Sequence, residues 1–460
     1  MDLTVKAGAA KPPLVLTIDL GSSSARVLLF DATGQPLVGI GAQERYAVRA
    51  SADGASEDDP DAAIERIERC VDAVLQQAGP LAGQIGAVAV DTLVSNMLAI
   101  DAAGKPLTPL IIYADTRNAD DALALRQALD ERAVHQRTGC LLRTSYWPAR
   151  LAWLRRTKPA IWRAAARWIT IGEYLELRLF GECRAGLSVA AWGGLLDRRA
   201  LQYDAPLLDH LGLPAERLSP LADLDEPLRG LRAAYAERWP ALRDVPWLPA
   251  IGDGAAANIG SGASGPGQIA LTVGTTGALR VVLPSVAEVP AGLWCYRVDR
   301  RRALLGGATS EGGNIYAWLR QTLMLSEPDA LEAELAALPP DDHGLTVLPF
   351  VAGERSPGWA GDVRATIHGL GLSSTPAEIV RACLEGVAYR FALIFAQLEA
   401  AGTSALAGEA RIIVSGGALL SSPAWMQIVA DALGRAVVAS DEQEATSRGV
   451  ALRFGGVGRA

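Results

Sequence analysis

Two glycine-centred turns, about half the chain apart, constrain the fold of this protein more than any other feature of its sequence. The first lies in Ile18–Val27 (IDLGSSSARV) and the second in Thr272–Val281 (TVGTTGALRV). Each follows an apolar run typical of a β-strand and leads directly into another, which predicts a hairpin with small, hydroxyl-rich residues at its tip. The backbone N–H groups of such a tip form a concave anion site. Two such anion sites, one in each half of the chain, indicate a nucleotide held from both sides. Only the first turn has a carboxylate, Asp19, shortly before its glycine.

Composition limits the class of protein. The 460 residues suffice for two or three domains, and half of them are apolar, as in globular proteins. The net charge of −8 and the lack of a basic stripe argue against a nucleic-acid partner. The five cysteines are odd in number and form no Cys-x-x-Cys pair, and the four histidines lack metal-ligand spacing. No run reaches the ~18 apolar residues of a spanning helix, and no signal peptide is recognisable. We therefore expect a cytoplasmic protein with reduced thiols and no membrane partner.

Strand-like and helix-like segments alternate along the chain, which predicts an α/β fold. Strands are expected on both sides of each glycine turn and at Ile85–Val90, which has the apolar character of a buried strand. Asp58–Gln77 has helical periodicity with its apolar residues on one face. A stretch dense in Pro, Leu and Asp, at 201–249, is interpreted as a loop-rich connector. It divides the chain into two predicted domains, 1–249 and 250–460.

The common nucleotide-binding motifs are absent or misplaced. No Gly-Lys-Ser/Thr sequence occurs, so there is no Walker A loop. Gly260–Gly265 matches the G-x-G-x-x-G pattern, but it follows a helix-like run and precedes a strand. This order is the reverse of the dinucleotide-binding fingerprint. We therefore interpret the match as a turn, and a dehydrogenase is disfavoured.

The order and spacing of the glycine motifs resemble the FGGY carbohydrate kinases, members of the actin-like ATPase superfamily. The resemblance covers essentially the whole chain. Its most specific segments are Ile18–Val27, Ile251–Gly260, Leu271–Val281, Gly306–Trp318, Leu345–Pro357, Ala382–Tyr389 and Val414–Gly434. It implies a two-domain α/β fold of the actin-like, ribonuclease H-like type with a central cleft. It also implies an enzyme that phosphorylates a hydroxyl of a sugar, sugar acid or polyol with ATP and Mg²⁺.

Two aspartates match charged positions of the family. Asp253, within Gly252–Ala256, matches the catalytic base, and a carboxylate that accepts the proton of a sugar hydroxyl suits that role. Aspartate also favours the N-cap of a helix, and the two roles are compatible. Asp19 matches the aspartate that reaches Mg²⁺, usually through water. The alternative for Asp19 is a carboxylate that caps N–H groups of its own turn.

The glycine-rich segments match the nucleotide site of the family. The resemblance implies contacts to the phosphates from residues of both turns, namely Gly21, Ser22, Ser23, Ser24, Gly274, Thr275 and Thr276. It implies an adenosine site formed by four glycines, namely Gly312, Gly313, Gly416 and Gly417. Ser421 stands where some relatives have an adenine-contacting asparagine. The alternative for the glycines is tight turns between strands and helices.

The substrate is expected to bind near the end of the Ile85–Val90 strand. Ser95 and Asn96 follow it, and Ser95 replaces a histidine of the xylulose kinases, which argues against a typical member of that group. Asp115 and Arg117 match an aromatic-x-Asp-x-Arg segment of the family. Together with Asp253, these four residues are the predicted substrate-binding set. An aldonate would need a cation, which Arg117, Arg143 or Arg150 can supply, unless they form ordinary salt bridges.

Three segments that the family places mainly near the nucleotide look most like gluconate-kinase-type members, namely Gly252–Gly260, 309–314 and 354–359. This likeness favours a gluconate-type substrate. The alternatives are a kinase for a ketose such as xylulose or ribulose, and a degenerate member that binds sugar or ATP as a non-catalytic switch. A homodimer is left open as the assembly. The sequence stops at Ala460, where family members usually continue the last helix, so either a short member or an altered C-terminus is expected.

Overall fold

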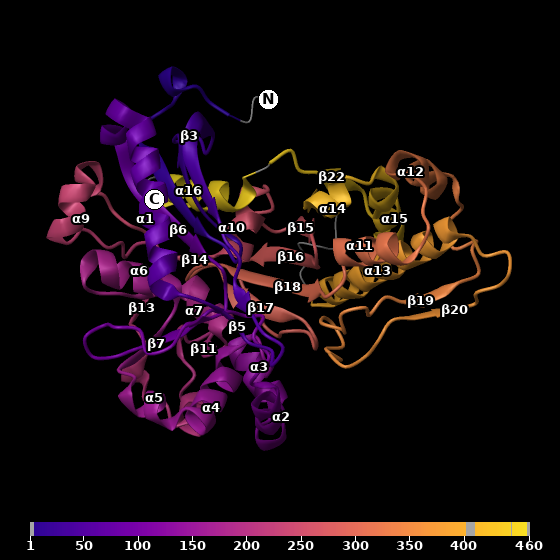
Figure 1. Ribbon diagram of the computed structural model, residues 1–460, viewed down its shortest axis with the longest axis horizontal. Helices are drawn as coiled ribbons and strands as arrows, with labels where there is room; N and C mark the ends of the chain where they lie inside the picture. Colours follow the sequence, from indigo (N-terminus) through magenta and orange to yellow (C-terminus); the bar gives the residue numbers. More distant parts are fainter. Residues whose placement is uncertain (1–3, 402–409, 443, 458–460) are drawn as a thin grey trace. The chain divides into compact units, whose positions relative to one another are not determined.

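The structure, a computed structural model, describes residues 4–401, 410–442 and 444–457. The chain forms two compact units (Figure 1). The first comprises Met1–Gly260, Tyr296–Ala303 and Gln443–Ala460, and the second comprises Ser261–Cys295 and Leu304–Glu442. Both contain sheets and helices, so the predicted α/β class is confirmed. Within the described residues, no helix is both long enough and apolar enough to cross a membrane.

A five-stranded sheet forms the centre of the first unit. Its order is β14 (Ile251–Gly252), β6 (Ile85–Thr92), β1 (Leu14–Leu20), β2 (Ser24–Phe30) and β3 (Pro36–Arg45). The first three strands are parallel, and β2 and β3 run antiparallel to their neighbours. Strands β1, β2 and β3 follow one another with short turns between them, and such strands pair antiparallel. Strands β6 and β14 come after long connections, which allow parallel pairing.

Helices cover this sheet. The predicted helix at Asp58–Gln77 is confirmed as α1 (Pro60–Ala78). Asp59 caps its N-terminus, because its side chain accepts hydrogen bonds from the N–H groups of Asp61 and Ala62. All four apolar side chains of its predicted face are buried, namely Ile64, Ile67, Val71 and Val74. Two further helices, α10 (Asp253–Gly260) and α16 (Ala445–Val457), pack against each other and against β6.

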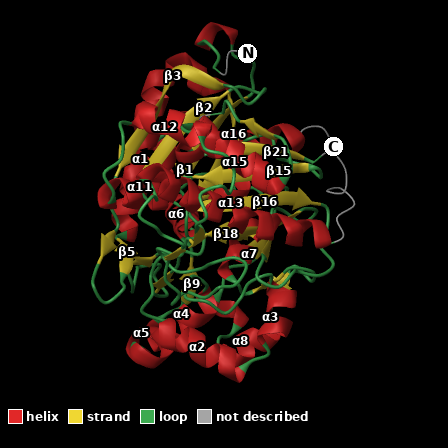
Figure 2. Cartoon of the chain, turned by 90° about the vertical axis from the view of Figure 1, so that its right-hand side faces the viewer, coloured by secondary structure: helices red, strands yellow, loops and turns green. Residues whose placement is uncertain are grey.

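The rest of the first unit consists of further helices and short strands, and part of it surrounds a second hydrophobic core that includes Trp168 and Leu151. Its helices α2, α4, α5 and α8 lie together (Figure 2). The helices are α2 (Ala119–Ala128), α3 (Glu131–Thr138), α4 (Trp147–Thr157), α5 (Pro159–Ala164), α6 (Ile171–Phe180), α7 (Leu187–Gly193), α8 (Ala205–Leu211) and α9 (Ala233–Arg238). The strands are β4 (Arg49–Ala50), β5 (Ser56–Asp58), β7 (Leu98–Ile100), β8 (Leu110–Ile111), β9 (Arg167–Ile169), β10 (Ala185–Gly186), β11 (Leu196–Asp197), β12 (Gln202–Tyr203) and β13 (Leu221–Ala222).

The predicted connector at 201–249 is more ordered than a loop. It contains β12, β13, α8 and α9 and two 3₁₀ turns, η3 (Ala215–Arg217) and η4 (Pro240–Leu242). Its apolar residues explain the order, because Trp239 and Trp247 are 1% and 2% exposed in the core of the first unit. Two other 3₁₀ turns are η1 (Ala7–Ala9) and η2 (Gly79–Gln84).

The second unit contains a six-stranded sheet in the order β17, β18, β16, β15, β21, β22. The strands are β17 (Trp294–Arg297), β18 (Ala303–Thr309), β16 (Gly277–Leu283), β15 (Gln268–Val273), β21 (Arg411–Ser415) and β22 (Val437–Ala439), with a separate hairpin of β19 (Thr346–Leu348) and β20 (Thr366–His368). The helices are α11 (Gly313–Thr322), α12 (Pro328–Ala337), α13 (Pro376–Ala400), α14 (Gly417–Leu420) and α15 (Pro423–Leu433). Thr375 and Glu378 form a capping box at the start of α13, the longest of these helices.

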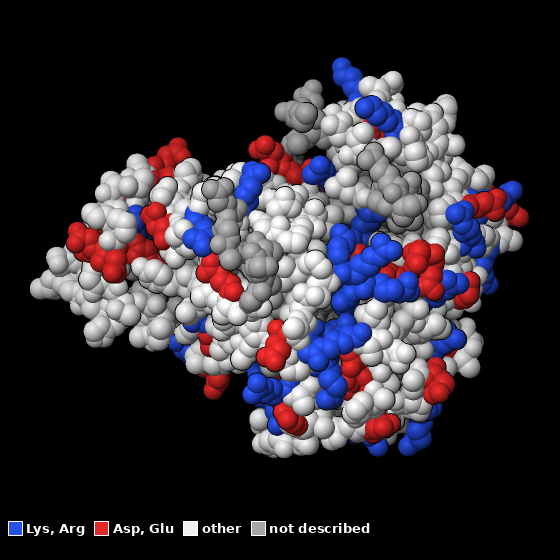
Figure 3. Space-filling model, turned by 180° about the vertical axis from the view of Figure 1, so that it is seen from behind, with Lys and Arg blue, Asp and Glu red and all other residues white. Residues whose placement is uncertain are grey.

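The compact units divide the chain differently from the boundary at 249/250 that the sequence predicts. Ile251 pairs with Asp91 of β6, so β14 is part of the first sheet. Gly260 of α10 and Gly449 of α16 meet backbone to backbone, which brings the last helix to the same unit. Asp253 therefore belongs to the first unit, whereas the predicted boundary assigns it to the second half. On the face drawn in Figure 3, Lys and Arg side chains lie beside Asp and Glu.

Candidate active site

Three aspartates stand at the carboxyl ends of three neighbouring parallel strands of the first unit. Asp19 of β1 and Asp91 of β6 are direct partners in the sheet register. Ile251 of β14 also pairs with Asp91, and Asp253 follows two residues later as the first residue of α10. Residues that pair across strands point to the same face of a sheet, and open α/β sheets bind ligands outside the carboxyl ends of their strands. The fold therefore collects these carboxyl groups from sequence positions far apart.

The three carboxyl groups differ in burial. Asp91 is 0% exposed, and its two carboxyl oxygens meet no N–H or O–H donor among the described residues. Asp19 and Asp253 are partly exposed. Burial raises the pKa of Asp91 well above its ordinary value, and the charges of Asp19 and Asp253 add to that rise. Burial also raises the pKa of Asp19, although its contact with Asp91 and the charge of Arg26 act in the opposite direction.

Arg26 is the cation nearest this group in the sheet. It lies on β2 directly opposite Asp19, and it forms an ion pair with Glu444, which precedes α16. Part of its charge is therefore balanced by Glu444. The carboxyl ends of β1, β6 and β14 therefore keep an excess of carboxyl groups. Carboxylate oxygens are ligands that Mg²⁺ prefers.

The first glycine turn is the hairpin that the sequence predicts. It joins β1 to antiparallel β2, and the N–H of Gly21 donates to the carbonyl of Ser24 at 3.0 Å. The hydroxyl of Tyr46 donates to the carbonyl of Gly21 and so fixes the turn. Ser22 is partly exposed and Ser23 is exposed, so the tip is open to a ligand.

The second glycine turn joins β15 to β16 and is also a hairpin. The N–H of Gly274 donates to the carbonyl of Thr276 at 3.0 Å, and Thr275 and Thr276 are exposed. The first turn of α11 bonds to this hairpin, because the N–H of Gly313 donates to the carbonyl of Gly274 at 2.7 Å. A side chain at Gly312 would collide with the backbone of Thr276 at 2.7 Å. The two predicted nucleotide segments are thus packed against each other.

A cavity of about 550 Å³ opens beside this second turn. It is lined by Gly274, Thr275, Gly313, Asn314, Ala317, Trp318, Gln321, Gly417 and Ala418. The cavity therefore brings together residues from three of the predicted nucleotide segments. Gly416, just outside it, has a φ of +94°, and a side chain there would lie 2.4 Å from the carbonyl oxygen of Val273. Ser421 does not line the cavity, and its hydroxyl donates to the carbonyl of Ala418.

Four of the predicted substrate residues have partners inside the protein. The Ser95 hydroxyl donates to the carbonyl of Trp192, and Asn96 is fully buried, with its side chain bonded to backbone groups of Leu93 and Ile171. Asp115 is 1% exposed and accepts hydrogen bonds from Ser56 and Arg117.

Arg117 also pairs with Glu57, at 2.5 Å. These contacts explain the local structure of the segments. A direct role in substrate binding stays a prediction for all four residues.

The three candidate cations for an aldonate have different surroundings. Arg117 and Arg143 are both in ion pairs, Arg143 with Glu131. Arg150 is fully buried and forms no ion pair among the described residues. Its guanidinium donates to the carbonyls of Ser95 and Ser145, and burial lowers its pKa to about 9.

An aromatic group lies beside Asp253. The sequence predicts that the Thr144–Trp147 stretch, which contains Tyr146, lines the substrate pocket, whereas Trp192 and Tyr296 were not predicted. The rings of Trp192 and Tyr296 are stacked with centroids 3.7 Å apart, and the hydroxyls of Tyr296 and Tyr146 lie 2.5 Å apart. A side chain at Gly252 would lie 2.8 Å from Nε1 of Trp192, so the glycine before Asp253 allows the indole to approach. Trp192 and Tyr296 come from distant segments without a shared motif, which is why no sequence signal marks them.

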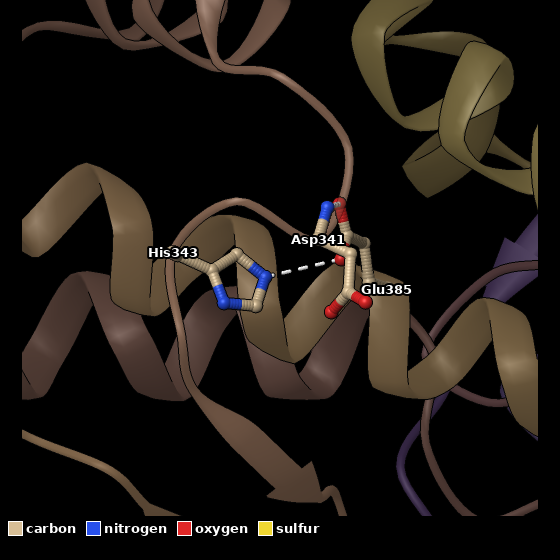
Figure 4. A group of neighbouring side chains, drawn as sticks. All are labelled: Asp341, His343 and Glu385. Atoms are coloured by element: carbon tan, nitrogen blue, oxygen red, sulfur yellow. Dashed lines mark hydrogen bonds and ion pairs between the residues drawn. The ribbon is translucent and has the colours of Figure 1, made fainter.

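A second cluster of titratable side chains lies in the second unit. Figure 4 shows Asp341, His343 and Glu385, whose ligand atoms lie within 4.8 Å of one another. Nε2 of His343 lies 3.1 Å from Glu385, and Nδ1 accepts a hydrogen bond from the N–H of Leu345.

Arg381 donates to the same Glu385 carboxylate at 2.8 Å. The carboxylate that a metal ion would use is therefore already neutralised, and the cluster fastens the 341–345 loop to α13.

Comparison with known proteins identifies the family. Models of the N-terminal and C-terminal domains of the FGGY family of carbohydrate kinases match residues 14–260 and 269–455. A gluconokinase of Bacillus subtilis (strain 168) is 27% identical over 452 residues, covering 95% of this chain and 86% of that protein. A xylulose kinase of Lactococcus lactis subsp. lactis (strain IL1403) is 24% identical, covering 82% of this chain and 75% of that protein. A glycerol kinase of Aromatoleum aromaticum (strain DSM 19018 / LMG 30748 / EbN1) is 30% identical, with coverages of 96% and 90%.

The solved structures agree on the fold. The crystal structure of gluconate kinase from Lactobacillus acidophilus superposes with a TM-score of 0.89 at 24% identity, covering 97% of this chain and 90% of that one. The two domain models together span nearly all of the described residues, and the family's N-terminal model extends through Asp253. The resemblance inferred from the sequence is thereby confirmed, and the protein is a phosphotransferase enzyme. The chain belongs to the FGGY family of carbohydrate kinases.

Proposed function

We propose that this sugar kinase transfers the γ-phosphoryl group of ATP to a hydroxyl of gluconate or a closely related sugar acid, with Asp253 as the general base. The observation that carries the proposal is the position of Asp253. It is a partly exposed carboxylate at the head of α10, directly after a strand that ends beside Asp19 and Asp91. A catalytic base needs access to substrate and a fixed position, and this residue has both.

The local structure suits proton transfer. A sugar hydroxyl is a poor nucleophile, and a carboxylate that accepts its proton typically accelerates a reaction by 10²–10⁴-fold. The N–H of Gly254 donates to Oδ1 of Asp253 at 2.7 Å, which orients the carboxylate. The stacked rings of Trp192 and Tyr296 close one side of this position and supply an apolar wall for the C–H face of a sugar.

The nucleotide is assigned to the cavity beside the second glycine turn. Thr275 and Thr276 supply exposed hydroxyls and backbone groups for the phosphates, and the glycines at 312, 313, 416 and 417 allow a flat purine to approach the backbone. Trp318 and Gln321 line the same cavity, so they join the predicted nucleotide residues. Gly21, Ser22, Ser23 and Ser24 of the first turn and Ser421 keep their predicted roles as proposals.

A divalent cation fits the carboxyl groups of the first unit. Asp19 is partly exposed at the end of β1, so its carboxyl oxygens are open to a cation, and carboxylate oxygens are ligands that Mg²⁺ prefers. We assign Mg²⁺ to Asp19, where it would neutralise charge on the phosphate groups when bound. The cytoplasmic location and the homodimer stay predictions.

The substrate preference follows the relatives. The gluconokinase of Bacillus subtilis matches 95% of this chain, and the gluconate kinase structure shares its fold. Ser95, where xylulose kinases have histidine, argues in the same direction, although a xylulose kinase is also among the relatives. A ketose kinase is the second candidate on that ground.

A coupled assay of ADP release tests the proposal. The panel contains gluconate, xylulose, ribulose and glycerol at equal concentration, with Mg²⁺ and ATP. The proposal predicts the highest kcat/KM with gluconate. A higher kcat/KM with xylulose or ribulose would replace the sugar acid by a ketose, and nucleotide binding without ADP release on any member would favour a non-catalytic switch.

A further inference from the structure

Asp91 is a charged residue at the candidate active site that neither the sequence motifs nor the proposed function uses. It is the last residue but one of β6, and it lies between Asp19 of β1 and Ile251 of β14 in the sheet. Its side chain is 0% exposed, and both carboxyl oxygens lack a hydrogen-bond donor among the described residues. A buried polar group without a partner is costly, so its presence calls for an explanation.

A structural role does not account for Asp91. Asp115, another carboxylate of this unit, is 1% exposed, and it accepts hydrogen bonds from the backbone of Ser56 and from the Arg117 side chain at 2.7–3.1 Å. This is how a buried structural carboxylate is normally satisfied. Asp91 has no comparable donors. It is the register partner of Asp19, and two carboxyl groups can share only a single proton.

The charges around Asp91 are unbalanced. Asp19 and Asp253 stand at the ends of the two strands that flank β6, and Arg26 lies on β2 opposite Asp19. Arg26 is itself paired with Glu444. When both are ionised, the carboxylates of Asp19 and Asp91 repel each other in a site of low dielectric constant. A divalent cation between them would attract both and stabilise the pair.

We propose that Asp91 supplies a second carboxylate for the divalent cation that Asp19 binds. The proposal rests on the proposed function, which assigns Mg²⁺ to Asp19. The sheet register sets the two side chains on the same face of neighbouring strands, and the partly exposed Asp19 gives the cation a route from solvent. Mg²⁺ in kinases typically keeps several waters and takes one or two protein carboxylates.

The test measures Mn²⁺ binding, not turnover. Free Mn²⁺ is titrated by electron paramagnetic resonance in mixtures of the full-length protein with ADP, for the wild type, D91N, D91S and D19N. D31N is the matched control. Asp31 is also buried, at 3% exposed, and it follows β2 at the end of the sheet opposite to Asp19 and Asp91. Its carboxylate accepts hydrogen bonds from Thr33 and Gln35, which an amide oxygen can also accept.

We expect D91N and D91S to weaken Mn²⁺ binding by about 10- to 100-fold, as removal of a group that supports a metal site usually does. D31N should bind Mn²⁺ like the wild type, and the Mn²⁺-induced rise in Tm should shrink in both Asp91 variants. Without metal, both Asp91 variants should unfold at or above the wild-type Tm, since they lose an unpartnered buried carboxyl.

Three results would overturn the proposal. If the Asp91 variants bind Mn²⁺ normally while D19N does not, Asp91 is no part of the cation site and the proposed function stands. If both Asp91 variants fail to fold, Asp91 is a structural residue. If the wild type neither binds Mn²⁺ with ADP nor releases ADP with any sugar, the proposed function fails together with this inference.

Discussion

The contact between α10 and α16 makes a sharp prediction for Gly260→Ala. The two helices approach so closely that a Cβ atom on Gly260 would lie 1.7 Å from the carbonyl oxygen of Ala445. From the other side, a Cβ on Gly449 would lie 1.9 Å from the carbonyl of Ala256. Both obstacles are backbone atoms, which cannot rotate away. The short helix that begins with Asp253 therefore depends on glycine at the crossing.

The size of the effect follows from the geometry. An ordinary contact begins at 3.4 Å, so the helices would have to separate by about 1.7 Å. Overpacking of this kind usually costs about 1–3 kcal/mol, and we expect the upper end of that range because neither side can yield. Since α10 is short and rigid, much of the shift should reach Asp253, and a ~1 Å misplacement of a catalytic group can cost ~10²-fold in rate.

Urea unfolding and ADP-release kinetics check this prediction. Gly83→Ala is the matched control, because Gly83 lies in the same unit and a Cβ there would meet no atom within 4 Å. We expect the control to keep both the unfolding midpoint and kcat, and Gly260→Ala to lower both. A Gly260→Ala protein that matches the wild type in both measurements would refute the idea that this crossing positions the base.

Further variants test other parts of the account. Burial raises the pKa of Glu176 to about 8, so the folded protein keeps its proton between pH ~4.5 and 8 while the unfolded chain loses it. Glu176 should therefore lower the free energy of unfolding as pH rises through this window, by up to about 1.4 kcal/mol per pH unit, and E176Q, compared by urea titration, should show a correspondingly smaller fall. Gly416→Ala should lower the free energy of unfolding in urea by about 1–3 kcal/mol, since it strains a φ of +94°, whereas Gly371→Ala, in open space, should not. Equal stability of the two glycine variants would contradict the packing argument.

Much of the fold was predictable because its signals are local. The two hairpins follow from a strand, a glycine and another strand within ten residues, and the buried face of α1 follows from its 3.6-residue period. The catalytic role of Asp253 was inferred from the match of its short glycine-rich segment to the family, and it stays a prediction. The predicted connector at 201–249 was too loop-like, because short elements held by Trp239 and Trp247 carry little periodicity.

The parts that sequence reasoning missed depend on contacts between distant segments. Asp91 can be recognised as a candidate site residue only in the folded chain, where β1 and β14 bring Asp19 and Asp253 beside it. Likewise, Trp192 and Ile171, which bond to the side chains of Ser95 and Asn96, lie 97 and 75 residues away, which no motif reveals. A residue type can therefore be recognised from the sequence, whereas its hydrogen-bond partners require the fold.

The role of Asp253 is tested most directly by measuring turnover and nucleotide binding in one variant. In Asp253→Ala, we predict that sugar-dependent ADP release falls by at least ~10²-fold, because the hydroxyl proton has lost its acceptor. The ADP affinity, measured by calorimetry on the same preparation, should be unchanged, since the nucleotide cavity lies among residues of the second unit. Near-normal ADP release in this variant would contradict the account.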